Sequence, residues 1–254
     1  MFCSYGKFVI IVDAGGILCP IHFIKKIFFH VVKSYGITLQ DTQLQQFAMY
    51  AAMLLEWNQK MNLTAITDMD EIYEKHFLDS ILPSFDVKLK GTFCDVGAGA
   101  GFPSIPLKIV YPDLEITIVE TLGKRITFLE ALCHQLKLNN VHCVHARAED
   151  YAKEHRESFD IVSARAVANL TMLSELCIPL VKVGGMFLAL KGANALEEYA
   201  LAEKAIRLLG CEEKRRDEKV LSDGSKRVNF VFEKVKKTPL KYPRAFAQIK
   251  KNPL

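Results

Sequence analysis

The chain has 254 residues, half of them hydrophobic, so it can bury one large core together with a smaller accessory element. Its 33 basic and 29 acidic residues give a formal net charge of only +4, which excludes a uniformly basic or acidic protein. The seven cysteines are widely spaced without a Cys-x-x-Cys pair, which excludes a disulfide framework and a zinc knuckle and predicts a cytoplasmic protein with reduced thiols and no metal.

Residues 1–19 are predicted to form an N-terminal extension that packs poorly. Phe8–Val12 is apolar, but Asp13 interrupts it, and the run is far too short to cross a membrane. A signal peptide would need a longer apolar core and a processing site. We therefore expect no membrane partner.

Residues 20–85 are predicted to form a helical cap that packs on a sheet. We expect Asp41 to cap the start of its long helix. That helix is indicated by apolar residues at helical spacing, namely Leu44, Phe47, Ala48, Ala51, Leu54 and Leu55.

A further helix of the cap is predicted over 70–81, ending before Pro83. On this helix His76 and Asp79 are three positions apart, so their side chains share a face. We expect a structural hydrogen bond between them, because buried polar groups normally find partners.

The most informative stretch is 93–103, where a short apolar run is followed by glycines at alternate positions, Gly97, Gly99 and Gly101. It predicts a buried strand, a tight turn and a helix that opens at Pro103, because proline suits the first helical position. Glycine lets the main chain turn sharply and lets a ligand lie against it. This layout is typical of the ligand corner of a doubly wound α/β sheet.

The residues of the loop narrow the choice of ligand. A dinucleotide fingerprint would need glycine where Phe102 stands, and a Walker A loop would need a Gly-Lys-Ser/Thr ending. Pro103 also removes an amide that a phosphate could use. A ligand with a sugar and an adenine ring but no phosphate fits, such as S-adenosylmethionine (SAM), with Asp95 as a nearby negative group. The alternative is a glycine-rich turn without a ligand.

The next predicted strand, 115–120, alternates in polarity and ends in Glu120. Glu120 lies 19 residues past Gly101, which matches the acid that binds ribose hydroxyls about 20 residues beyond such a loop. The alternative is a solvated carboxylate at the end of a strand.

The rest of the chain alternates strands and helices as a doubly wound sheet requires. The loops 147–150 and 165–169 follow two of these strands and therefore fall on the ligand edge. The predicted elements are helices over 123–138, 170–181 and 195–209, and strands over 141–145, 159–163, 186–190, 212–221 and 228–232.

The basic excess is a feature of the C-terminal end. Residues 234–254 hold seven lysines and arginines and no acid, whereas the rest of the chain has 26 basic and 29 acidic residues. We predict that 236–254 is a basic tail that contacts nucleic-acid phosphates. The alternative is a solvated tail that only aids solubility. The candidate side chains are Lys237, Lys241, Arg244, Lys250 and Lys251.

Eight blocks of sequence stand in order from Glu56 to the end, within a longer resemblance to one protein family that begins at about residue 35 and has no large gaps. They are Glu56–Ile66, Lys75–Ser80, Asp95–Pro103, Leu122–Leu129, Arg147–Asp150, Ala164–Ala168, Lys237–Arg244 and Lys250–Leu254. Together they resemble the bacterial small-subunit ribosomal RNA methyltransferases once called glucose-inhibited division protein B. Ser104 stands where that family usually has glycine, which is a mild change near the start of a helix.

The resemblance implies an α/β fold of the Rossmann-like class I SAM-dependent methyltransferases. Its sheet would have seven mostly parallel strands, with 86–235 as the SAM-binding domain beneath the N-terminal helical cap. The activity implied is methyl transfer from SAM to N7 of a guanine in 16S rRNA. The partner would be that RNA, the small ribosomal subunit or its assembly intermediate, and the protein would be a monomer.

The resemblance also assigns roles to single residues. Arg165 becomes the candidate catalytic residue, because it could aid cofactor binding or orient the base. The alternative for Arg165 is a strand-end ion pair. Glu120 would hold the ribose, and Gly99 belongs to the same glycine loop. The full set of expected SAM contacts is Gly97, Gly99, Phe102, Glu120, Ala148, Glu149 and Arg165.

The sequence lacks the motifs of other methyltransferase mechanisms, which agrees with the implied chemistry. Guanine N7 carries an in-plane lone pair, so its methylation needs alignment and a shielded site more than a general base. The chain has no Pro-Pro of the amino-methyltransferase motif and no nucleophilic-cysteine signature of cytosine methyltransferases. Two alternatives stay open, namely a methyltransferase for a small molecule or protein, and a catalytically silent RNA-assembly factor.

Overall fold

The computed structural model describes residues 2–5, 8–13, 16–18 and 24–254, with side chains from Phe28 onward. The first three elements are β1 (Phe2–Tyr5), β2 (Phe8–Asp13) and β3 (Gly16–Leu18), which pair antiparallel in that order. The packing of the predicted N-terminal extension depends on side chains outside the described set.

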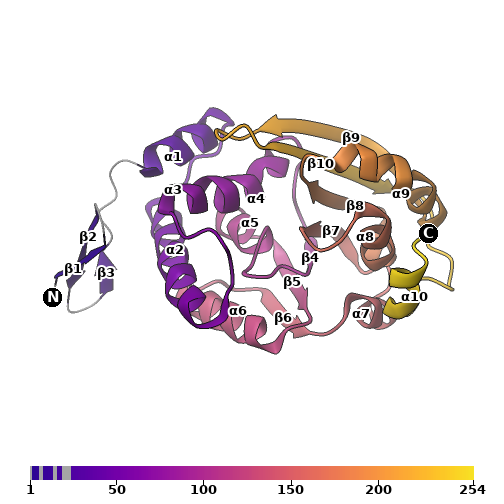
Figure 1. Ribbon diagram of the computed structural model, residues 1–254, viewed down its shortest axis with the longest axis horizontal. Helices are drawn as coiled ribbons and strands as arrows, with labels where there is room; N and C mark the ends of the chain where they lie inside the picture. The colour runs from indigo at the N-terminus through magenta and orange to yellow at the C-terminus, as the bar shows by residue number, and fades with distance from the viewer. Residues whose placement is uncertain (1, 6–7, 14–15, 19–23) are drawn as a thin grey trace.

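The main sheet has seven strands in the order β6-β5-β4-β7-β8-β10-β9 (Figure 1). Five of them pair parallel, while β10 pairs antiparallel with both β8 and β9. This confirms the predicted mostly parallel sheet and its late hairpin. The strands are β4 (Thr92–Val96), β5 (Glu115–Glu120), β6 (Val141–His145), β7 (Phe159–Arg165), β8 (Val181–Lys191), β9 (Cys211–Val220) and β10 (Lys226–Lys234).

The strands alternate their side chains between two cores, one on each face of the sheet. Phe93 and Ile161 pack into the core beneath the cap, whereas their neighbours Cys94 and Val162 pack into the opposite core. Figure 1 shows α2, α5 and α6 on the first face and α7, α8 and α9 on the second. These helices span α2 (Asp41–Met61), α5 (Ser104–Val110), α6 (Gly123–Gln135), α7 (Ala148–Glu154), α8 (Leu170–Cys177) and α9 (Ala195–Leu209).

The cap consists of α1 (Ile24–Ser34), α2 and a composite helix. Asp41 lies in the first turn of α2 rather than capping it, because Gln40 takes the capping position and donates its N–H to the Gln43 side chain at 2.8 Å. The composite helix joins α3 (Met69–Glu71), a π-helical stretch (Ile72–Leu78), α4 (Asp79–Ile81) and a 3₁₀ turn (Leu82–Phe85). It continues through Pro83, since proline is tolerated in the first turn of that 3₁₀ segment.

Two other predicted helices have different bounds. The helix predicted over 170–181 divides into α8 and a 3₁₀ turn, Ile178–Leu180, because Pro179 cannot donate a helical hydrogen bond. The helix predicted to open at Pro103 begins at Ser104, with Pro103 in the capping position.

The C-terminal segment packs on the second face instead of standing free. It ends in α10 (Phe246–Lys251), whose Ile249 is buried against the core that contains α8. Lys234 is also buried and donates to the Ile178 carbonyl at 2.8 Å and to Thr238 Oγ1 at 2.6 Å. None of the helices in the described part of the chain is long and apolar enough to span a membrane.

Candidate functional site

The glycine loop follows the central strand β4 at the carboxyl edge of the sheet. Gly97 and Gly99 have φ angles of +72° and +62°, a conformation in which a Cβ is strained. A Cβ added to Gly97 would lie 2.7 Å from Val167 Cγ2, whereas no described atom stands within 4 Å of one added to Gly99. The loop is therefore covered at Gly97 and open at Gly99.

Glu120 faces this open part of the loop from the end of β5. Its Oε2 accepts the Gly99 N–H at 3.1 Å, and its Oε1 accepts the N–H of Thr121 at 2.9 Å and of Leu122 at 3.1 Å. The side chain is 2 % exposed and is also paired with Arg125, whose Nη1 lies 3.4 Å from Oε2. The structure thus brings the predicted ribose ligand to the glycine loop, and it adds Arg125, which the sequence analysis missed.

Asp95 lies beneath the loop and does not line the ligand side. It is fully buried, and its Oδ2 accepts the Ser104 N–H at 3.1 Å at the start of α5. Burial raises the pKa of Asp95 to about 7, against the opposing effects of the Ser104 hydrogen bonds and the Arg165 charge. Its Oδ1 and the Oγ of Ser163, its neighbour in register on β7, have no hydrogen-bond partner among the described residues.

Ala148 and Glu149 open α7 directly after β6, so they reach the same edge of the sheet. Both are buried, and the Glu149 carboxylate lies 3.8 Å from Nη1 of Arg147. Arg147 itself is largely exposed and stands over the ring of Phe246, at 5.5 Å from its centroid. This contact places the start of α10 at the ligand edge.

Phe102 turns its ring away from the loop and into the interface with the cap. The ring stacks on His76 at 4.4 Å and on Tyr50 at 5.4 Å between centroids, and it is 5 % exposed. Any contact between Phe102 and a cofactor would therefore use its main chain.

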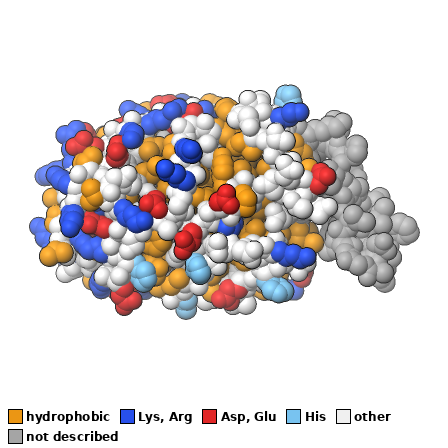
Figure 2. Space-filling view, turned by 180° about the vertical axis from the view of Figure 1, so that it is seen from behind, with side chains coloured by type: hydrophobic (Ala, Val, Ile, Leu, Met, Phe, Trp, Pro, Cys, Tyr) orange, Lys and Arg blue, Asp and Glu red, His pale blue; other side chains and the backbone are white. Residues whose placement is uncertain are grey.

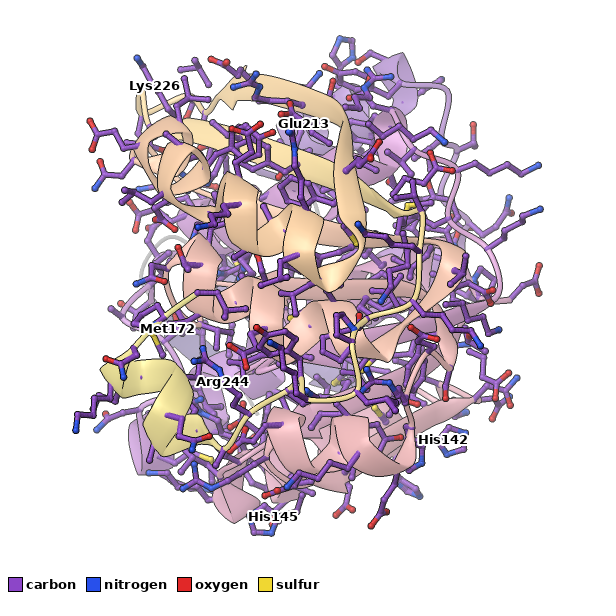
Figure 3. All side chains as sticks on the ribbon, turned by 90° about the vertical axis from the view of Figure 1, so that its right-hand side faces the viewer. His142, His145, Met172, Glu213, Lys226 and Arg244 are labelled. Carbon is purple, nitrogen blue, oxygen red and sulfur yellow. The ribbon has the colours of Figure 1, made fainter. Side chains whose placement is uncertain are left out.

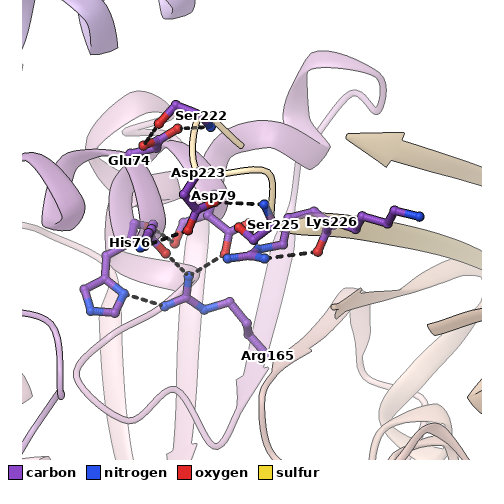
Figure 4. Close-up of polar contacts among 11 residues, drawn as sticks. Glu74, His76, Asp79, Arg165, Ser222, Asp223, Ser225 and Lys226 are labelled. Carbon is purple, nitrogen blue, oxygen red and sulfur yellow. Dashed lines mark hydrogen bonds and ion pairs between the residues drawn. The ribbon is translucent and has the colours of Figure 1, made fainter. Parts of the chain in front are cut away.

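Arg165 also points into the cap, where it contacts His76 and Asp79 (Figure 4). These three residues and Phe102 are hereafter the Arg165 cluster. Its Nη1 donates to Asp79 Oδ2 at 3.1 Å and to the Lys75 carbonyl at 3.2 Å, and its Nη2 lies 3.3 Å from His76 Nδ1. The guanidinium stands 4.8 Å from the centroid of the Phe102 ring. Arg165 is thus held by an ion pair, as the alternative interpretation expected.

His76 and Asp79 meet through Arg165, which stands between them, and not by the direct hydrogen bond predicted from the sequence. Burial and the Arg165 charge lower the pKa of His76 to about 3, so the imidazole is neutral at physiological pH. Its Nε2 lies 2.8 Å from Thr64 Oγ1. Both ring nitrogens of His76 are therefore engaged within the cluster, and the neutral ring adds no charge to it.

The predicted RNA-binding side chains do not form one surface. Arg244 is committed to the buried Glu175, with Nη2 to Oε2 at 2.6 Å, and Figure 3 shows it beside α10. Lys237 follows β10, which runs antiparallel to β8, so it lies at the amino edge of the sheet, opposite the glycine loop. Only Lys250 and Lys251, on α10, belong to an element that contacts Arg147 at the ligand edge.

Within the described residues, no group of three or more histidine, cysteine or acidic side chains could hold a metal ion. The features that could hold a cofactor are instead the open main chain at Gly99 and the Glu120 carboxylate. A carboxylate beside exposed main chain suits a sugar diol and an uncharged or cationic ligand. The residues present therefore fit SAM.

Comparison with known proteins gives a consistent result. Residues 43–238 match the GidB family model, described as rRNA small subunit methyltransferase G. The chain is 50% identical over 232 residues to the ribosomal RNA small subunit methyltransferase G of Lysinibacillus sphaericus, covering 89% of this chain and 98% of the relative. It is 55% identical over 214 residues to that of Listeria monocytogenes, covering 82% and 90%.

Two solved structures are similar in fold alone. TYW2 of P. horikoshii, in complex with MeSAdo, has a TM-score of 0.50 and 16% identity, covering 62% of this chain and 61% of that one. The YcgJ protein of Bacillus subtilis has a TM-score of 0.50 and 13% identity, covering 63% and 100%.

Proposed function

The chain belongs to the GidB family of rRNA small subunit methyltransferases and is a SAM-dependent methyltransferase, and we propose that it transfers the methyl group of SAM to N7 of a guanine in 16S rRNA. The observation that carries the proposal on this chain is the pairing of Glu120 with the glycine loop. Their contact at 3.1 Å joins two motifs that are 21 residues apart in the sequence.

Each part of the site has a physical role in this reaction. Bound SAM supplies an electrophilic methyl group. Glu120 would accept hydrogen bonds from the ribose hydroxyls of SAM, and the main chain at Gly99 would leave room for the cofactor against the sheet. Val167, which covers Gly97, is 40 % exposed and gives the site an apolar wall. This wall would help to exclude water and to align the methyl group with the base, which is what a nucleophile that loses no proton requires.

Methylation at N7 needs no general base, and the titratable groups near the site are poorly suited to act as one. The pKa of His76, near 3, leaves it a poor proton acceptor, and Asp95 is sealed beneath the loop. The base must nevertheless reach the site, and in an A-form helix N7 lies in a deep, narrow major groove. We therefore propose that the target guanine is exposed in the substrate, which is naked 16S rRNA, the small subunit or an assembly intermediate.

We propose that RNA phosphates are contacted at the ligand edge, by Arg147, Lys250 and Lys251. Arg147 is 59 % exposed in its side chain and joins α7 to α10. Figure 2 shows the face behind the view of Figure 1, where basic and acidic side chains are interspersed without one large basic field. The functions of Lys237, Lys241 and Arg244 in RNA binding stay predictions. We further propose that the protein acts as a monomer.

The proposal is tested by transfer of labelled methyl from SAM to 30S subunits and to naked 16S rRNA. The Glu120→Gln variant removes the carboxylate, and Glu115→Gln, an exposed position at the other end of β5, is the matched control. We expect label at a guanine, mapped by N7-sensitive strand cleavage, in the wild type and in Glu115→Gln but not in Glu120→Gln. SAM binding without transfer to any form of ribosomal RNA would contradict the substrate and leave the fold standing.

A further inference from the structure

Asp79 holds two arginines at once, one on each carboxylate oxygen. Its Oδ2 accepts from Arg165 Nη1 at 3.1 Å, and its Oδ1 accepts from Arg227 Nε at 2.9 Å. The Asp79 side chain is 8 % exposed, so both ion pairs are shielded from solvent. Arg165 comes from the end of β7 and Arg227 from the start of β10. Three elements that are far apart in the sequence therefore meet at one carboxylate.

The same part of the cap is tied to the turn between β9 and β10 (Figure 4). Glu74 accepts the Ser222 N–H at 2.6 Å and the Ser222 hydroxyl at 2.5 Å. Lys75 Nζ lies 2.9 Å from Asp223 Oδ2. These contacts lie on the π-helical stretch that precedes Asp79, and such a stretch often occurs at functional sites. The hairpin turn thus fixes the helix that presents Asp79.

The position of the Arg165 guanidinium bears directly on the walls of the cofactor site. Phe102, beneath the guanidinium, directly follows the glycine loop. On the other side of Arg165, Ala166 has a φ of +57°, a strained conformation for alanine that turns Val167 over Gly97. A shift of Arg165 would therefore move both the glycine loop and its cover.

We propose that Asp79 is a positioning residue for methyl transfer, which acts by fixing Arg165, and that Arg227 holds the Asp79 carboxylate in the orientation that does so. The inference extends the proposed function, because it names residues that act on the same site from a distance. Removing Asp79 leaves two arginines without their shared anion, and an unpaired charge in a buried site is strongly unfavourable. Removing Arg227 leaves the Asp79–Arg165 pair in place, so its effect is smaller.

The test compares Asp79→Asn and Arg227→Gln with Asp86→Asn. Asp86 is the matched control, because it also pairs the end of the cap with the hairpin, at 2.8 Å from Arg215, yet makes no contact with Arg165. Methyl transfer to 16S rRNA, SAM affinity and the thermal transition are measured for each variant. We expect kcat to fall on the order of 30-fold for Asp79→Asn and about 5-fold for Arg227→Gln, since misplacement of a site by about 1 Å can cost 100-fold. Asp86→Asn should stay within about twofold of the wild type.

Asp79→Glu keeps the carboxylate and is expected to recover part of the lost kcat. A second readout, the exchange-protected side-chain N–H signal of Arg165 in ¹⁵N spectra, should disappear in Asp79→Asn and persist in Asp86→Asn. The inference is overturned if Asp79→Asn, while folded, matches Asp86→Asn in kcat and SAM affinity. A wild type that methylates no ribosomal RNA would instead contradict the proposed function, and the Arg165 signal and SAM affinity would still decide the inference.

Discussion

At Gly99 no described atom lies within 4 Å of where a Cβ would stand, whereas three residues later the Phe102 ring packs against His76, Tyr50 and Arg165. The glycine loop and the Arg165 cluster are neighbours at one edge of the sheet, yet one offers open main chain and the other packed side chains. A ligand can lie against the open main chain at Gly99, and the packed side chains beside it keep the end of the loop in place. The two regions divide these tasks between them.

Substitution of Gly97 or Gly99 should have the largest effect on cofactor binding, and the two substitutions should differ in the size of that effect. Both positions have positive φ, so alanine at either costs about 1–2 kcal/mol of strain. Gly97→Ala also places a Cβ against Val167, so we expect SAM affinity to fall on the order of 100-fold, compared with about 10-fold for Gly99→Ala. Calorimetric titration with SAM measures both. An equal or larger loss in Gly99→Ala would show that the open end of the loop, and not its cover, limits binding.

This division also explains which parts were predictable from the sequence. The glycine loop and Glu120 follow from local motifs, because a turn that needs glycine and an acid at a strand end are fixed by the residues around them. The interior position of Phe102 and the inward orientation of Arg165 depend on Asp79, which lies 86 residues from Arg165 in the sequence. No local pattern specifies such a pairing.

The C-terminal segment shows the same limit for charge. Seven basic residues without an acid predict a solvated or RNA-binding tail, but Arg244 has its acid on α8, where Glu175 is 1 % exposed in its side chain. Lys234 is likewise buried against Thr238 and the Ile178 carbonyl. Composition gives only the number of charges along the chain. The function of each charge depends on whether the fold buries it against a partner.

The two regions should also respond to pH in opposite directions. Asp95 beneath the loop has its pKa raised from 3.8 to about 7, so its contribution to stability is fully present below pH 3.8 and is lost as the pH rises through 7. His76 in the cluster has its pKa lowered from 6.5 to about 3, so its contribution is present above pH 6.5 and is lost as the pH falls towards 3. Over the range between pH 5 and pH 8 the two slopes oppose each other.

A single variant of each residue should show how that residue makes the free energy of unfolding depend on pH. We expect Asp95→Asn to gain about 2 kcal/mol in free energy of unfolding, relative to the wild type, on going from pH 5 to pH 8. His76→Gln should show the reverse, a relative gain of about 2 kcal/mol on going from pH 8 to pH 5. Urea unfolding at the two pH values gives both differences. Slopes of the same sign in the two variants would contradict the assignment of opposite protonation behaviour to the two regions.

The smallest expected effect concerns the exposed lysines and tests whether the position of the positive charges or only their number decides RNA binding. Lys250 and Lys251 lie on α10, which meets Arg147 at the ligand edge, whereas Lys237 lies at the amino edge. We expect the double variant Lys250→Ala/Lys251→Ala to reduce the salt dependence of RNA binding by a slope of about 1–2, since each lost phosphate contact removes about 0.7–0.9. SAM affinity should not change, because α10 contributes no residue to the glycine loop or to Glu120.

The control carries the same change in charge at different positions, Lys237→Ala/Lys241→Ala. If position decides, this double variant keeps the wild-type salt slope although it has lost the same two charges. If both double variants lose slope equally, the whole segment contacts RNA as a tail would, and the bound RNA must extend from the ligand edge to the opposite edge of the sheet. RNA binding measured by filter retention between 50 and 200 mM salt, roughly the range over which phosphate contacts are screened, distinguishes the two outcomes.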